Sequence, residues 1–398
     1  MTAIAPSLSN PFFRTRSTWL SYTLLACFGF ALSLVGPMMP FLAAKMELTF
    51  TQVGYHFTLM SVGIVVISLA GDRIAKRLGN DQMVWGAATL FGLALLGVTT
   101  GSSLAITMFF MFLFGSAIGA VVLISNTAIA LASGQHAAKA YTEANIIVGV
   151  AMIMGPVLAG LIAKSALGWQ AIAFLPLIYV GILKVFFWGL RLPLAQSGKE
   201  NSPESTRDVD KRPLPLLFWI FGMLMFLSVG IENLVSAMGA SFFTTVVGLD
   251  LSTSAAIMSV FAVAIVLGRM IGRYLLGLMT ESRLLILSLV WVLLTFPVYW
   301  LSTLPILNVL GMFLVGLGVG NLAPLCMSGA MTSAGEATNR ASARFGLFPP
   351  IAILTFLQLF SILSDQFGMQ RAYTFMIVLV IVAIAMVTST NRLRRATA

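Results

Sequence analysis

Residues 59–79 read LMSVGIVVISLAGDRIAKRLG, and residues 257–277 read IMSVFAVAIVLGRMIGRYLLG. A shift of 198 positions superposes the two segments, with identities that include Met60, Ser61 and Val62. A shift of 201 superposes MFLFGSAIG (111–119) on MFLVGLGVG (312–320). Two matches in the same order, at nearly the same shift, predict that the chain is an internal duplication.

The composition indicates that both copies lie in a membrane. The chain has 398 residues, of which 59% are hydrophobic and 9% charged, against roughly 25% charged residues in soluble domains. Apolar runs of about 20 residues, the length that crosses the hydrocarbon core as an α-helix, recur along the chain. We expect an all-α membrane protein with twelve transmembrane helices, near residues 18–44, 51–70, 82–100, 103–132, 141–164, 169–190, 214–247, 252–275, 282–301, 303–334, 341–364 and 370–390.

The positive charges predict how the helices are oriented. The net charge is +10, and nineteen of the 23 Lys and Arg residues fall on one side of the twelve-helix arrangement. Lys45, Lys164 and Arg371 fall on the other side, and Lys184 lies within the sixth span. Cytoplasmic loops carry such an excess of Lys and Arg, so we expect both termini in the cytoplasm. The basicity therefore reflects topology, not a nucleic-acid partner.

The two copies define the domain organisation. Residues 192–213 form the longest polar stretch, rich in Ser, Pro and charge, and predict a cytoplasmic linker. The predicted segments are a cytoplasmic N-terminus (1–17), a six-helix half (18–191), the linker (192–213), a second six-helix half (214–391) and a basic cytoplasmic tail (392–398). No permitted Asn-x-Ser/Thr sequon occurs, which favours the bacterial inner membrane as the location.

Glu232 is the one carboxylate in the apolar run 214–247. An ionisable side chain at membrane depth is costly and usually faces a bundle interior or a water-filled cavity. Ser228, Glu232 and Ser236 are spaced i, i+4 and i+8, so they share a helix face that we expect to point inward. Glu232 is the candidate for proton coupling, because burial favours the neutral acid and a nearby cation the charged form. It could instead bind a cationic substrate.

Five further buried polar side chains are candidates for the substrate cavity. Each could instead form an interhelical hydrogen bond that only stabilises the bundle. They are Asn126, Asn145, Asn233, Asn321 and Gln358.

Polar clusters at two helix ends predict a gate. Asp72, Arg73, Lys76 and Arg77 follow the second span and resemble the loop signature of the major facilitator superfamily, with Ala75 in place of the usual Gly. A carboxylate is stabilised near a helix N-terminus, so we expect Asp72 to latch the halves in the outward-open state. Its partners are the N-terminal arginines of the eleventh span, Arg340 and Arg344. Alternatively, the cluster is a solvated turn that only sets topology.

The counterpart of this cluster in the second half is Gly268-Arg269-Met270-Ile271-Gly272-Arg273. Its glycines favour close helix packing, and Arg269 and Arg273 can extend to the membrane surface. Gly115-x-x-x-Gly119 and Gly316-x-x-x-Gly320 are likewise patterns of close helix packing.

The duplication and the Asp72 cluster together resemble the major facilitator superfamily across the whole chain. Gly230-Ile231-Glu232-Asn233, Asn126 and Ala144-Asn145 further resemble its fucose permease-like branch of sugar/proton symporters. In one respect the chain departs from that branch. Those symporters carry functional carboxylates in the first and fourth helices, whereas here both spans lack Asp and Glu.

The resemblance implies two halves related by an axis along the membrane normal, with the substrate site between them near the midplane. We therefore expect a monomeric secondary active transporter that moves a small organic solute by alternating access, with proton-coupled uptake (symport). Efflux by proton antiport and facilitative uniport are alternatives in the same class. A receptor or scaffold that does not transport is the alternative from another class. No constellation of catalytic or metal-binding residues predicts an enzyme, and we expect no metal or cofactor.

Overall fold

The computed structural model describes residues 13–190, 192 and 213–396. The predicted linker falls almost wholly outside these residues, as do most of the predicted N-terminal segment and the last two residues of the predicted tail.

The described chain is helical throughout its spans, as predicted. Twelve helical segments in the described residues are long and apolar enough to cross a membrane. The helices of the first half are α1 (Arg16–Met46), α2 (Phe50–Leu78), α3 (Asn80–Thr100), α4 (Leu104–Ser133), η1 (Gly134–His136), α5 (Ala137–Lys164), η2 (Trp169–Ala173) and α6 (Phe174–Phe186). Those of the second half are α8 (Leu216–Ser236), α9 (Gly239–Thr245), α10 (Leu251–Leu275), α11 (Glu281–Leu301), α12 (Pro305–Val319), α13 (Leu322–Ala334), η3 (Gly335–Ala337), α14 (Thr338–Phe345), α15 (Phe348–Phe367), α16 (Met369–Ala372) and α17 (Thr374–Ala396).

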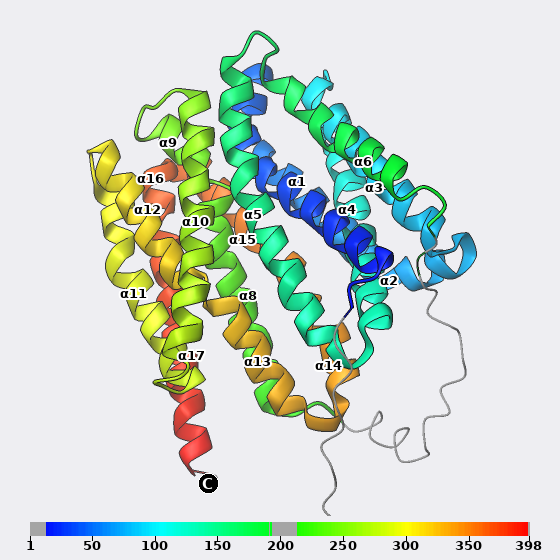
Figure 1. The fold of residues 1–398 in the computed structure, drawn as a ribbon. Helices are drawn as coiled ribbons and strands as arrows, with labels where there is room; N and C mark the ends of the chain where they lie inside the picture. The colour runs from blue at the N-terminus through cyan, green and yellow to red at the C-terminus, as the bar shows by residue number, and fades with distance from the viewer. Residues whose placement is uncertain (1–12, 191, 193–212, 397–398) are drawn as a thin grey trace, which may run out of the picture.

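The two halves stand side by side (Figure 1). The end of the bundle where α1 begins and α17 ends is called the terminal face below; in Figure 1 the red α17 ends at the bottom and the dark-blue α1 begins near mid-height on the right. The end where α1 passes into α2 is called the opposite face. The duplication is visible in the local structure, because the single-turn helices η1 and η3 begin 201 positions apart, at Gly134 and Gly335.

Several predicted spans are interrupted, which corrects their boundaries. The predicted helix 214–247 is α8 and α9, and the predicted helix 303–334 is α12 and α13. The predicted helix 341–364 begins instead at 348, after the separate α14, and the predicted helix 370–390 is α16 and α17. Gly320-Asn321 and Pro349-Pro350 mark two of these joints, since glycine loosens a helix and proline removes a backbone donor.

The predicted close packing at glycine pairs is confirmed. A Cβ at Gly115 would clash with the backbone oxygen of Met60 on α2, and one at Gly268 with that of Leu317 on α12. Gly320 similarly faces the backbone of Ile265. These contacts pack α2 on α4 in the first half and α10 on α12 in the second.

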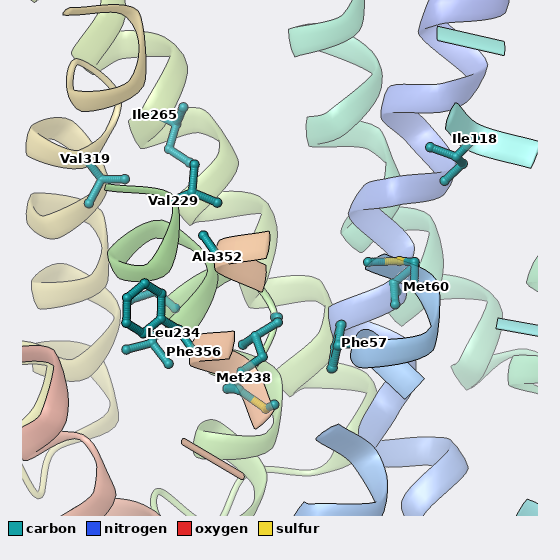
Figure 2. Packing of buried hydrophobic residues seen from close by; sticks show 14 of the residues in the cluster. Phe57, Met60, Ile118, Val229, Leu234, Met238, Ile265, Val319, Ala352 and Phe356 are labelled. Atoms are coloured by element: carbon teal, nitrogen blue, oxygen red, sulfur yellow. The ribbon is translucent and has the colours of Figure 1, made fainter. Parts of the chain in front are cut away.

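The halves meet mainly through α2 against α15 and α5 against α10. Both pairs are antiparallel, because one helix runs toward the opposite face and its partner away from it. Figure 2 shows the apolar side chains of this region, with Phe57 and Met60 of α2 on one side and Val229, Met238 and Phe356 of the second half on the other. One buried apolar cluster runs through both halves.

Candidate functional site

A cavity of about 230 Å³ lies between the two halves. Its walls come from α1, α2 and α5 of the first half and from α8, α10 and α15 of the second. These are corresponding helices of the duplication, three from each copy. The cavity is therefore a product of the two-fold architecture.

Glu232 lies in the wall of this cavity, on α8. Among the lining residues that the structure describes, it is the only ionisable one. The Arg269 guanidinium of α10 interacts with the carboxylate electrostatically, but no ion pair within 4.0 Å joins Glu232 to a described residue. The carboxylate thus faces the cavity without a close counterion among the described residues, so it can receive a proton or a cationic group from the cavity.

The remaining lining is mostly apolar. Apart from Glu232, the polar lining side chains are Ser33, Asn233 and Ser236, and the others include Phe57, Met60, Met152, Met258 and Phe261. The Asn233 amide donates to the Val229 carbonyl one turn earlier (2.9 Å), which leaves its oxygen as an acceptor. An apolar wall with a few convergent polar groups is typical of small-molecule sites.

The end of α8 positions the acidic residue. The helix stops at Ser236, and α9 begins at Gly239 after a short break. Gly36 of α1 packs against the Ser236 carbonyl, where a Cβ would clash. Discontinuous helices of this kind form substrate sites in many transporter folds. Pro156 of α5 and Pro349 at the start of α15 bring two further helix irregularities to the cavity wall.

Not all predicted cavity residues line the cavity. Asn233 and Ser236 do, but the Ser228 hydroxyl is buried and lies 3.6 Å from the Cys326 sulfur on α13. The physical reason is helix geometry: at about 100° per residue, Ser228 and Ser236 point about 80° apart, so one face does not hold the whole stripe. The prediction for Ser228 therefore needs correction.

The other four candidates also lie elsewhere. Asn145 is exposed outside the cavity, and the Asn126 backbone oxygen accepts from the Tyr141 hydroxyl (2.8 Å). Asn321 lines a groove with α10 and α11 instead, with its amide on the Leu317 carbonyl (3.4 Å). Gln358 accepts a hydrogen bond from Thr58 (3.1 Å) and so joins the halves.

The predicted latch residues lie at the terminal face. Asp72, Arg73, Lys76 and Arg77 are all exposed, and Asp72 forms no hydrogen bond or ion pair with a described residue. Arg344 and Arg273 are exposed, and Arg340 is half-buried. Arg269 donates to the Gly320 carbonyl at the joint between α12 and α13 (3.3 Å). Because the latch was predicted for the outward-open state, its formation stays a prediction.

Two features of the site were not predicted. Ser33 lines the cavity from α1, and its only signal was a hydroxyl within an apolar span. The large apolar residues of the wall carry no signal at all, because a Met or Phe that faces a cavity cannot be told in sequence from one that faces lipid.

The model of the Major Facilitator Superfamily matches residues 22–348. The chain belongs to the Major Facilitator Superfamily. Members of this superfamily are multi-pass membrane transporters of small molecules, not enzymes, and the twelve apolar helices in the described part of the chain agree with this. The match is to the superfamily as a whole and does not resolve the fucose permease-like branch.

One relative resembles part of the chain in sequence. A quinolone resistance protein, NorA of Staphylococcus aureus, is 22% identical over 219 residues, which cover 55% of this chain and 54% of the relative. The aligned region thus spans about half the length of that relative.

Two solved structures align along nearly the whole chain. A mutant of the nucleoside transporter NupG has a TM-score of 0.77 at 14% identity, and covers 94% of this chain and 99% of its own. A D-xylose-proton symporter has a TM-score of 0.75 at 15% identity, and covers 93% and 96%. Both confirm the fold.

Proposed function

We propose that this protein is a monomeric, proton-coupled secondary transporter of the bacterial inner membrane, in which Glu232 carries the coupling proton. The observation that supports this most strongly is the position of Glu232 as the only ionisable residue in the described wall of a cavity between the halves. A carboxylate at this depth costs at least a few kcal/mol, a cost that a proton-carrying role explains. The fucose permease-like resemblance supports uptake.

The terminal face is the cytoplasmic face in this proposal. The excess of Lys and Arg on that side supports the assignment. The contacts between the halves at the opposite face, such as Thr58 with Gln358 and Lys164 with Thr253 (3.2 Å), then close the cavity toward the outside. Alternating access consists of opening that face while the terminal face closes, with Asp72 as the latch of the second state.

The size and lining of the cavity restrict the solutes that can bind there. Its volume of about 230 Å³ lies below the roughly 300 Å³ at which ligand pockets usually begin, so the solute is small or the cavity widens on opening. A thermal-shift screen of the purified protein against sugars, organic acids, amines and lipophilic cations identifies the class, because a ligand stabilises the state that it binds.

The test uses proteoliposomes and the most stabilising solute. We expect Glu232→Gln to abolish uptake driven by a pH gradient and to retain counterflow, in which labelled solute exchanges without net proton movement. Glu281→Gln is the matched control, because Glu281 lies at the N-terminus of α11, where it accepts from Ser328 (2.8 Å), away from the cavity. Unaltered driven uptake in the Glu232 variant would refute the coupling role.

A second candidate is efflux of a lipophilic solute by proton antiport. The apolar cavity wall favours it, and so does the similarity to a quinolone resistance protein over half of the chain. Uptake and efflux differ in the direction of driven flux. In right-side-out vesicles with an acidic exterior, symport concentrates the solute inside, whereas antiport depletes it.

A further inference from the structure

Asp365, near the end of α15, lies over the N-terminus of α2 in the other half. Its two carboxylate oxygens accept from the backbone N–H groups of Phe50 (2.8 Å) and Thr51 (2.7 Å). The first N–H groups of a helix lack partners within the helix, and the helix dipole adds positive charge there. Asp365 therefore supplies from the second half the anion that the N-terminus of α2 favours.

The N-terminus of α2 has a neutral cap of its own. Thr49 accepts from the Gln52 N–H (3.3 Å), and the Gln52 side chain accepts from the Thr49 N–H (3.0 Å). This capping box satisfies two donors, and Asp365 satisfies the two between them. Among the groups that bind these four N–H donors, Asp365 is the charged one, and it comes from the other half of the protein.

The corresponding position in the other helix pair carries the opposite sign. The residue 201 positions before Asp365 is Lys164, the last residue of α5, and the N-cap of α10 that corresponds to Thr49 of α2 is Asp250. Lys164 donates to the Thr253 hydroxyl on α10 (3.2 Å). Asp250 accepts from the Thr253 N–H (3.0 Å) and attracts Lys164 electrostatically.

We infer that Asp365 and Lys164 are two charge-reversed clamps that hold the opposite face closed. Each clamp lies in one half and binds the start of a helix in the other, and its sign is set by the cap of that helix. Where the cap is Asp250, the clamp is a lysine; where the cap is the neutral Thr49, the clamp is an aspartate. The consequence for transport rests on the proposed alternating access, because both clamps must open for the cavity to reach the other side.

The helices approach closely beside both clamps. A Cβ at Gly54 of α2 would lie 2.8 Å from the Cβ of Ser361, and one at Gly160 of α5 would lie 2.6 Å from the Cβ of Ala256. Both clamps thus lie beside tight contacts between the halves.

The experiment changes the charge of the clamp residue Asp365 and of the helix cap Thr49. Spin labels at exposed residues of the opposite face, Leu167 in the first half and Leu304 in the second, report the separation of the halves in a Cys27→Ala, Cys326→Ala background. We expect Asp365→Lys to place a cation on the helix dipole of α2 and Thr49→Asp to place two carboxylates together. Each single variant should raise the ratio of long to short distances at least about tenfold, because Asp365→Lys removes two charge-assisted hydrogen bonds and Thr49→Asp adds a repulsion between carboxylates.

The decisive variant carries both changes, Thr49→Asp with Asp365→Lys. It transfers the arrangement of Asp250 and Lys164 to the other helix pair, so we expect it to restore the distance distribution of the unmodified protein. Asp365→Asn, which keeps the side-chain size, gives a smaller opening and covers the case in which the lysine variant does not fold. Single variants with unchanged distances, or a double variant as open as the single ones, would overturn the inference. The distances need no solute, so their outcome is independent of the transport assay.

Discussion

A methyl group at Gly160 should open the opposite face. Gly160 packs against α10, where a Cβ would lie 2.6 Å from the backbone oxygen of Ser252 and 2.6 Å from the Cβ of Ala256. Real Cβ contacts of this length essentially never occur, and a backbone oxygen cannot rotate away. Gly160→Ala therefore forces α5 and α10 apart, and we expect it to destabilise the closed face by the roughly 1–3 kcal/mol typical of overpacking.

That free energy corresponds to a change of about 5- to 150-fold in the equilibrium between closed and open faces. The assay measures how fast a membrane-impermeant thiol reagent, added from the opposite face, modifies a Ser236→Cys residue in the cavity wall. Cys27 and Cys326 are replaced by alanine in this background. In Gly160→Ala the rate of thiol modification should rise by the same factor as the equilibrium between closed and open faces.

Gly181→Ala is the matched control. Gly181 lies within α6, and a Cβ there would meet nothing within 4 Å. Both variants gain helix propensity equally, by about 1 kcal/mol, so any difference between them reports the contact with α10. Equal labelling rates in the two variants would refute the tight closure at Gly160.

Three further predictions concern single side chains. Asp72→Asn should remove the terminal latch and lower labelling of the Ser236→Cys residue from the opposite face; unchanged labelling and transport would exclude the latch. Asp250→Ala should cost about 0.5–2 kcal/mol of thermal stability through loss of a helix cap, whereas Asp250→Asn should cost less. Hydrogen bonds from Thr253 lower the pKa of Asp250 from its ordinary value of 3.8, and the positive charge of Lys164 lowers it further by a smaller amount. The stabilisation by Asp250 should therefore be complete above that pH and decline on acidification, as thermal unfolding at several pH values would show. Tyr373→Phe should cost about 1–3 kcal/mol of thermal stability, because the buried Leu234 carbonyl then loses its hydroxyl donor, while proton coupling should not change.

The fold could be predicted because three independent patterns agreed: apolar runs of membrane length, the side bias of Lys and Arg, and the repeat. The joint between α8 and α9 could not, since no proline or charged residue lies between Ser236 and Gly239; the joint between α16 and α17 was missed although Gln370 and Arg371 lie beside it. Packing against the other half, as at Gly36, places the first of these joints.

The candidate site could be predicted in part. Glu232 stood out because a carboxylate in an apolar run has few explanations, and Ser236 followed from its spacing. Gln358 was equally conspicuous, but it accepts a hydrogen bond from Thr58 of the other half. A polar side chain in a membrane can form a hydrogen bond between helices as readily as it can line a cavity. Asp365 was not predicted, since its partners are backbone groups more than 300 residues away.

The central claim is that Glu232 links solute movement to proton movement through the cavity. Its most direct test records the pH inside proteoliposomes, with a trapped pH-sensitive dye, when solute is added without a proton gradient. The account predicts that solute entry changes the internal pH in the unmodified protein and in Glu281→Gln, and that Glu232→Gln exchanges solute without any pH change. A solute-evoked pH change of normal size in Glu232→Gln would contradict it.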